Sequence, residues 1–399
     1  MKKINGEKIS QSVIAILFLA GIFFIFLFNL KVPVAAAFSL RGGQNLEDVT
    51  ATFEENFNVV FPFKNFFVDI NGAGHQVLCQ REMNHVLKLD NGMTTEILPE
   101  RPEDEIRMNA ESLAEFSKWI SDDQGANFLY VQVPWKNFAY DSKLPEGIHD
   151  YSNEIADRFL NYLDEESVNY LDIRASIQDE GVDFYSLFLR TEHHWNSYGG
   201  FYAFTKLCNY METNFGEVID DKVLDIAQYN QDLYKNYSLG YYGQRTGFLF
   251  SGLDDFTLIY PKFDTEQSCE IPHKEIVRNG TFYDTVFDLE KLQLPWRERG
   301  MYATYIGGDY PLVIHESRTA ENEGTIMLFI DSFGTPVESF LTTAYQHVVA
   351  VDLRWVLRYG WDETAVDFIK QYKPDNVIVM LNPSQIGYTE DEQFIYGLE

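Results

Sequence analysis

Apolar and polar positions follow a regular pattern in two regions of the chain, from Met108 to Gly216 and again from Thr325 to Leu381. In both regions a short apolar run alternates with a longer segment in which apolar residues recur at helical spacing. The predicted strands are Asn127–Pro134, Val168–Ile173, Thr325–Ile330, His347–Leu353 and Asn376–Leu381. The predicted helices are Ala110–Asp123, Asn153–Glu166, Asn196–Gly216, Thr335–Gln346 and Ala365–Tyr372. This alternation predicts an α/β fold whose parallel sheet is covered by helices on both faces.

Two further segments lack this regular alternation. The stretch from residue 217 to 324 is rich in Tyr, Asp and Gly and is interpreted as a large irregular insertion. Residues 32–105 form a lead-in, in which Phe53–Ile70 has the pattern of an amphipathic helix broken at Pro62. The regular domain is therefore placed at 106–399.

The N-terminus carries an uncharged apolar run from Val13 to Leu30, preceded by Lys2, Lys3 and Lys8. As a helix this run would span about 27 Å, close to the thickness of a bilayer core. Residues 1–31 are therefore predicted to be a transmembrane signal anchor, with a cytoplasmic N-terminus and an extracytoplasmic body at a bacterial cell surface. The alternative is a cleaved signal peptide, since Val32–Phe38 offers small residues at a cleavage position.

Charge and cysteine content exclude some classes of protein. The formal net charge is −30, which argues against nucleic-acid binding because such proteins present basic faces. Cys79, Cys208 and Cys269 are widely spaced and form no CxxC pair, so a structural zinc or iron–sulfur site is not expected. One disulfide or three free thiols are both compatible with this spacing.

Two polar groups directly follow predicted strands. In LFIDSFG the strand ends at Ile330, and Asp331 and Ser332 fall in the turn before a helix. A serine in such a turn can be a nucleophile, because nearby backbone N–H groups can stabilise an oxyanion; the alternative is a helix cap. Asn382 follows the last strand, where its amide could donate to a developing negative charge, although Asn-Pro is also an ordinary start of a loop.

The segment RTEHHWNSYGG concentrates an acid and two histidines, Glu192, His193 and His194. In an extended segment Glu192 and His194 share one face, and His193 lies on the other. A carboxylate beside an imidazole suits an acid–His–Ser arrangement. A hydrogen-bonded structural cluster and a metal site are the alternatives, and the metal site lacks a third ligand at a usual spacing.

These residues together resemble SGNH-type esterases and acyltransferases, although the order of the motifs is circularly shifted. With the N-terminal anchor, the order resembles the DHHW proteins and the related alginate O-acetyltransferases of the AlgJ/AlgX type. Four segments carry the resemblance: Phe61–Phe67, Val131–Asn137, Arg190–Phe204 and Phe329–Pro336. The resemblance implies an SGNH-like three-layer sandwich with a parallel sheet.

The resemblance also implies a triad in which Ser332 is the nucleophile, His194 the base and Glu192 the residue that orients it. The residues expected at the oxyanion or substrate are Phe333, Asn382, Trp195, His193 and Arg190. Two positions depart from the family pattern: Glu192 replaces the usual Asp, and Ile330 replaces the Gly of the GDS motif, where it is expected to crowd the approach to Ser332.

The function implied is O-acyl transfer, most simply O-acetyl transfer to a cell-surface or exported polysaccharide through an acyl-serine. No metal or organic cofactor is expected. A membrane acyltransferase that supplies the acyl group is the expected partner. The alternatives are a non-catalytic carbohydrate-binding or assembly protein on the same fold, and a plain secreted esterase.

Overall fold

The computed structural model describes residues 6–28, 63–387 and 397. The chain divides into two compact units, Met1–Asn71 and Gly72–Glu399. Helix α1 covers Gly6–Phe28 in the first unit, and α4 begins at Lys64 in the first unit and ends at Val77 in the second. Within the described residues, no helix combines the length and apolar character needed to cross a membrane. Val32–Phe38 and the predicted helical pattern up to Pro62 lie outside the described residues.

The second unit is built around an eight-stranded sheet of order β5-β4-β13-β11-β12-β10-β8-β9. The strands are β4 (Asn127–Gln132), β5 (Tyr170–Asp172), β8 (Gln267–Ile271), β9 (Ile276–Gly280), β10 (Leu312–Ser317), β11 (Asn322–Ile330), β12 (Tyr345–Val351) and β13 (Asn376–Leu381). The five strands from β5 to β12 pair in parallel, as the sequence predicts.

The prediction of an entirely parallel sheet is wrong, because β10, β8 and β9 extend the sheet by antiparallel pairing. These three strands come from the segment 217–324, so much of the supposed irregular insertion is regular. Strand β8 alternates between buried and more exposed positions, and β9 between half-buried and exposed positions. They therefore lack the continuous apolar run by which the other strands stand out. The same segment holds a separate antiparallel pair, β6 (Tyr229–Ser238) and β7 (Asp254–Pro261).

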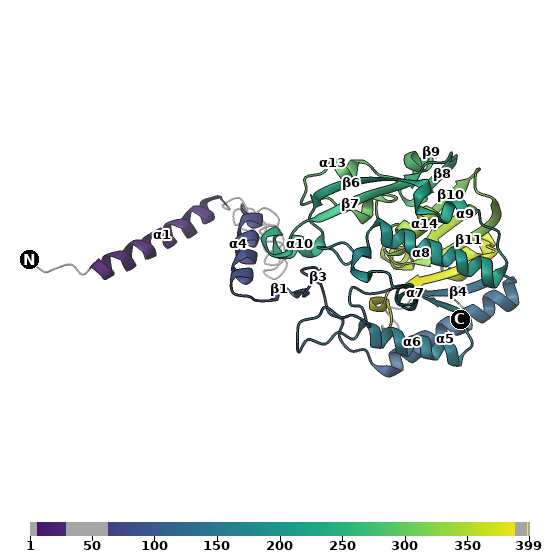
Figure 1. Ribbon diagram of the computed structural model, residues 1–399, viewed down its shortest axis with the longest axis horizontal. Coiled ribbons are helices and arrows are strands. Elements are labelled where there is room, and N and C mark those ends of the chain that lie inside the picture. The colour runs from purple at the N-terminus through teal and green to yellow at the C-terminus, as the bar shows by residue number, and fades with distance from the viewer. Residues whose placement is uncertain (1–5, 29–62, 388–396, 398–399) are drawn as a thin grey trace, which may run out of the picture. The chain divides into compact units, whose positions relative to one another are not determined.

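Helices cover both faces of the sheet, which confirms the three-layer α/β sandwich (Figure 1). On one face α7 (Ile173–Glu180), α8 (Ser197–Tyr210) and α14 (Gly334–Leu341) pack against side chains such as Leu328 and Ile330. On the other face α5 (Glu103–Trp119), α6 (Ser152–Glu165), α15 (Leu353–Arg358) and α16 (Ala365–Tyr372) pack against side chains such as Met327 and Phe329. Successive residues of β11 thus enter opposite cores, which explains why this strand is continuously apolar.

The remaining helices are short, and a small sheet precedes the main one. The helices are α9 (Asp221–Leu224), α10 (Tyr241–Thr246), α11 (Phe248–Ser251), α12 (Phe282–Val286) and α13 (Glu290–Gln293). The small sheet joins β1 (Glu82–Met83), β2 (Val86–Lys88) and β3 (Thr94–Thr95). All three cysteines are free: Cys79 is exposed, while Cys208 and Cys269 are buried.

Candidate active site

The candidate site lies at the carboxyl edge of the parallel strands. Ser332 follows β11, Arg354 lies at the start of α15 just after β12, and Asn382 follows β13. Because these three strands are neighbours and run in the same direction, their carboxyl ends meet at one edge, where open α/β sheets gather their chemistry. Ser332, Arg354 and Asn382 all line one cavity at this edge.

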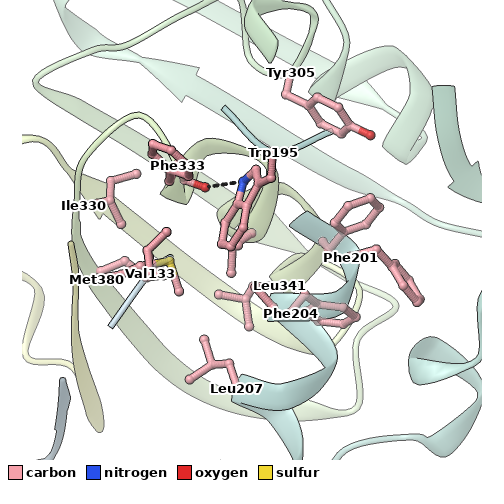
Figure 2. Close-up of a cluster of buried hydrophobic side chains, with 14 of the residues drawn as sticks. Val133, Trp195, Phe201, Phe204, Leu207, Tyr305, Ile330, Phe333, Leu341 and Met380 are labelled. Atoms are coloured by element: carbon pink, nitrogen blue, oxygen red, sulfur yellow. Dashed lines mark hydrogen bonds between the residues drawn. The ribbon is translucent and has the colours of Figure 1, made fainter. Parts of the chain in front are cut away.

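His194 reaches this edge from the segment before α8. Its Nε2 lies 2.7 Å from Ser332 Oγ, a hydrogen-bond distance across 138 residues of sequence. The segment is fixed by Trp195, which is 2% exposed and whose Nε1 donates to the Phe333 carbonyl at 3.0 Å (Figure 2). Trp195 therefore ties the histidine segment to the serine turn and does not line the cavity.

Glu192 lies between the two histidines. Its Oε1 is 2.6 Å from His193 Nδ1 but 3.5 Å from His194 Nδ1. His194 Nδ1 is buried and has no hydrogen-bond partner. The same Oε1 accepts from the His193 N–H at 2.9 Å, and Oε2 accepts from the Tyr241 N–H at 2.8 Å. The longer Glu side chain thus reaches a backbone donor in α10, and it is held more tightly by His193 than by His194.

The prediction that His193 faces away from Glu192 and His194 is wrong. The two imidazole rings lie side by side, with centroids 3.8 Å apart. The alternation rule fails because Thr191–His194 is a bend rather than an extended strand. Only a short bridge from Phe188 to Trp195 encloses it.

Burial controls the protonation of His194. Desolvation, reinforced by the positive charge of His193, lowers the pKa of His194 to about 3, so the imidazole is neutral at neutral pH. Burial also opposes ionisation of Glu192, but the charge and hydrogen bond of His193 outweigh it and hold the pKa of Glu192 well below its usual value. A neutral imidazole beside a hydroxyl and an ionised carboxylate is the charge pattern of a general base.

Asp331 joins the two strand ends that carry Ser332 and Asn382. One oxygen of its fully buried carboxylate accepts from the Phe333 N–H at 2.9 Å. The other accepts from both the backbone N–H and the side-chain amide of Asn382, each at 2.7 Å. Asp331 is therefore a bridge between β11 and β13 rather than a cap on α14.

This bridge changes the expected oxyanion site. The Phe333 N–H is already used by Asp331, so the prediction that it donates to an oxyanion is wrong for this arrangement. Asn382 gives one amide hydrogen to Asp331 and keeps a second one. In the described part of the chain, the Ser332 N–H donates to no protein acceptor.

Arg190 lies away from the cavity, contrary to the prediction that it binds substrate. Its Nε donates to the Ser251 carbonyl at 2.9 Å, and its backbone N–H donates to Asp254. Its backbone carbonyl accepts from the Thr94 N–H. Arg190 therefore joins its own segment by hydrogen bonds to the segments that hold Thr94, Ser251 and Asp254.

Lys136, in the loop after β4, supports the histidine segment from behind. The side chain is fully buried, and its Nζ donates to the carbonyls of Thr94 at 2.9 Å, Leu189 at 2.5 Å and Glu192. Desolvation lowers the pKa of Lys136 to about 7, although the negative charge of Asp254 opposes this.

The cavity in front of Ser332 has a volume of about 520 Å³. Its lining is Glu82, His85, Leu87, Glu96, Ile97, Leu98, Trp135, Ile148, His193, Tyr241, Tyr242, Ser332, Arg354, Asn382, Ser384 and Gln385. One wall, from Glu82 to Leu98, comes from the predicted lead-in segment. Asn382, Ser384 and Gln385 come from the loop after β13.

Two residues at the site were not predicted. Arg354 lines the cavity and is held by Asp352 through Nε at 2.9 Å and Nη2 at 2.6 Å. The signal available in the sequence was its position two residues beyond a strand-end acid, Asp352. Tyr302 stacks on His194, with centroids 3.9 Å apart, and donates to Asp309 at 3.2 Å. It lies in the segment taken as irregular, where no periodic pattern marks it.

Ile330 does not line the cavity, so the expected crowding of Ser332 is not observed. The side chain is 5% exposed and belongs to the core between the sheet and α14 (Figure 2). It packs on Gly334: a Cβ added there would lie 2.4 Å from Ile330 Cγ2. The larger side chain at 330 is thus accommodated by a glycine four residues later.

Glu192, His193 and His194 bring three donor atoms within 4.8 Å of one another, as a metal site would require. From the sequence, no third ligand at a usual spacing was found for a metal site. In the structure His193 lies close enough to Glu192 and His194 to be that third ligand. However, Glu192 Oε1 and His193 Nδ1 are 2.6 Å apart, whereas two ligands of a tetrahedral zinc at about 2.0–2.1 Å lie more than 3 Å from each other. The spacing fits a hydrogen bond better than a shared ion.

The chain matches two protein-family models. Residues 93–233 match the SGNH hydrolase-like domain of the acetyltransferase AlgX. Residues 173–351 match the DHHW protein model. The resemblance to the DHHW and AlgX-type families is confirmed. Both matches contain the segment from Glu192 to Trp195, and the second also contains Ser332.

Solved structures show the same fold. PatB1 from Bacillus cereus is 19% identical with a TM-score of 0.63, covering 77% of this chain and 99% of that one. The same protein with a sulfonyl adduct gives 18% identity and a TM-score of 0.61, covering 78% and 99%. A DHHW family protein from Eubacterium siraeum gives 19% identity and a TM-score of 0.56, covering 77% and 92%. Among the curated proteins none matches the chain.

Proposed function

We propose that this protein is an O-acyltransferase that works through an acyl-serine intermediate on Ser332. The observation that carries the proposal is the 2.7 Å contact between His194 Nε2 and Ser332 Oγ, at the edge of a cavity. The match to an SGNH hydrolase-like acetyltransferase domain supports acyl transfer as the reaction class.

In the first half-reaction His194 removes the proton of Ser332 as Oγ attacks the carbonyl carbon of the acyl donor. The new C–O bond produces a tetrahedral oxyanion, and His194 then returns the proton to the leaving oxygen as the donor's ester bond breaks. In the second half-reaction an acceptor hydroxyl gives its proton to His194 and attacks the acyl-serine. Ser332 regains its proton, so the cycle consumes no cofactor.

The oxyanion is assigned to the Ser332 N–H and the second amide hydrogen of Asn382. Preorganised donors of this kind stabilise charge that develops in the transition state. Arg354 lines the same cavity and adds a permanent positive charge, because Asp352 keeps its guanidinium ionised and in place although burial opposes the charge.

The acceptor is proposed to be a cell-surface or exported polysaccharide, and the acyl group to be acetyl. Support comes from the AlgX-type match and from the aromatic side chains Trp135, Tyr241 and Tyr242, which line the cavity. Anchoring through residues 1–31, an extracytoplasmic body and a membrane acyltransferase that supplies the donor belong to the same proposal. They rest on the apolar run from Val13 to Leu30.

The proposal is tested with 4-nitrophenyl acetate and the purified full chain. Replacing Ser332 by Ala is expected to lower kcat by at least about 10³-fold, because removing a triad nucleophile removes the covalent pathway. The matched control is Ser186→Ala, since Ser186 is exposed and lies outside the cavity. It should retain the activity of the parent protein.

Mass spectrometry of the quenched reaction should find an acetyl group on Ser332 in the parent protein and none in the Ser332→Ala variant. Undiminished turnover in that variant would overturn the proposal. Turnover that does not increase with any added polysaccharide hydroxyl would favour a plain esterase. Glycan binding without ester turnover would favour a non-catalytic role.

A further inference from the structure

We propose that His193 is a positioning residue for the Ser332–His194 chemistry, because its ring nitrogen holds the Glu192 carboxylate in reach of His194. This inference rests on the proposed function. It makes the acidic member of the site a carboxylate shared by two imidazoles rather than one that serves His194 alone.

The contacts of Glu192 divide unevenly between the two histidines. Oε1 lies 0.9 Å closer to His193 Nδ1, at 2.6 Å, than to His194 Nδ1, at 3.5 Å. The other hydrogen bonds to the carboxylate come from backbone N–H groups of His193 and Tyr241. His193 is thus the side chain that fixes where Oε1 lies.

His193 is itself held in place by aromatic rings. It stacks on Trp135, with centroids 6.1 Å apart and planes inclined by 25°. It also contacts the rings of His194 and Tyr242, at centroid distances of 3.8 and 5.8 Å. A ring fixed on these sides can hold the carboxylate within the narrow range of positions that catalysis requires.

The charged and titratable groups around the pair come from several elements. Lys136 lies behind Glu192 but donates to its backbone carbonyl and not to its carboxylate. Asp254 in β7 accepts from the backbone and side chain of Thr191, the residue before Glu192. Tyr242 from α10 faces His193, and Tyr302 covers His194. Arg354 adds a positive charge near His194 and lowers its pKa, as burial and His193 also do.

His193 therefore has two effects that a simple packing residue lacks. It keeps Glu192 ionised despite burial, because it supplies both charge and a hydrogen bond. His193 also fixes the position of Glu192 Oε1 before the reaction. It therefore sets how far Oε1 must move to accept a hydrogen bond from His194 Nδ1 after His194 has taken the serine proton. That movement is less than 1 Å if the contact closes from 3.5 Å to an ordinary hydrogen bond.

The test compares His193→Phe with His193→Asn in the full chain. Phe keeps an aromatic ring but has no donor, whereas the Asn amide places a donor near the position of Nδ1. For 4-nitrophenyl acetate, His193→Phe is expected to lower kcat by about 10–100-fold, the usual cost of losing a supporting partner, with little change in KM. His193→Asn should recover most of the lost kcat.

The pH profile provides the readout that packing alone would not change. Without His193 the pKa of Glu192 rises, since the largest contribution that opposes burial is lost and only that of His194 remains, and the carboxylate loses its charge at higher pH. The acid limb of kcat/KM should therefore move to higher pH in His193→Phe and return part of the way in His193→Asn, because the Asn amide restores the hydrogen bond but not the charge.

Parent kcat and an unchanged acid limb in His193→Phe would overturn the inference. So would equal losses in both variants with the parent pH profile, measured on protein shown by circular dichroism to be folded. Failure of the wider proposal is recognised separately, because it would appear as full activity in Ser332→Ala.

Discussion

The proposed base of this site is a histidine whose environment keeps it neutral. His194 is 2% exposed and lies between Tyr302, Phe333 and His193. Desolvation lowers its pKa to about 3. In the proposed reaction the neutral form must be present to accept the serine proton, so this environment favours the resting state of the base. It also makes the imidazolium costly, which is why the nearby carboxylate matters.

The pH dependence of activity follows from this pKa. A histidine base with an ordinary pKa of about 6.5 would lose activity about 30-fold at pH 5. Here the pKa of His194 is about 3, so kcat/KM for 4-nitrophenyl acetate is expected to change little between pH 7 and pH 5. Initial rates in buffers of constant ionic strength check this. An acid limb centred near pH 6.5 would contradict the assignment of His194.

At the scale of elements, the turn between β11 and α14 depends on a matched pair of side chains. Gly334 opens α14 directly beneath Ile330, and a methyl group at 334 would overlap both Ile330 Cγ2 at 2.4 Å and Ile330 Cβ at 2.5 Å. Ile330 Cβ cannot move away without displacing the end of β11. Gly334 is needed because a side chain would collide with Ile330, and not because its backbone adopts a left-handed conformation.

Replacing Gly334 by Ala is therefore expected to lower the free energy of unfolding by about 1–3 kcal/mol, the usual cost of overpacking. The cost should fall in an Ile330→Gly background, where the colliding side chain is absent. Gly74→Ala is the matched control, because no atom lies within 4 Å of the added Cβ in that helix. Urea denaturation is measured on the parent, Gly334→Ala, Ile330→Gly, the double variant and Gly74→Ala; equal stability of Gly334→Ala and the parent would refute the clash.

The sequence predicts the elements with continuous apolar runs and misses those without them. Strand β13 and helix α16 lie at their predicted bounds, and Asn196, where a helix is predicted to begin, caps α8. Ser332 and Asn382 could be predicted to meet because both follow parallel strands. The pairing of Glu192 with His193 could not, since it depends on a bend and on a backbone donor in α10 about 50 residues later.

At the scale of the whole molecule, some ionisable side chains in the protein interior have ring or carboxylate atoms without a hydrogen-bond partner among the described residues. His315 in β10 is 1% exposed, and neither ring nitrogen has a hydrogen-bond partner in the described part of the chain. Desolvation, with a further contribution from Arg278, lowers its pKa to about 3. The unfolded chain binds a proton at His315 near pH 6.5 and the folded chain does not, so stability is lost as pH falls below 6.5.

Replacing His315 by Leu should remove this contribution. At pH 5 the parent protein is expected to lose about 2 kcal/mol more of its pH 7 stability than the variant does. The variant should also be at least as stable as the parent at pH 7, because two unsatisfied polar atoms are removed. Urea denaturation at both pH values checks this, with His347→Leu as the control, because the His347 side chain is 42% exposed. Parallel losses in His315→Leu and the parent would exclude His315 as the source.

The buried ammonium of Lys136 has a consequence for how the chain acquires activity. Its Nζ donates hydrogen bonds to the backbone carbonyls of Thr94, Leu189 and Glu192. These residues lie up to 98 positions apart along the chain (94 to 192). No contiguous fragment supplies all of these groups until residue 192 has been synthesised, and Ser332 follows 140 residues later (192 to 332). In the proposed reaction, a nascent chain therefore lacks an organised nucleophile until Ser332 has been synthesised.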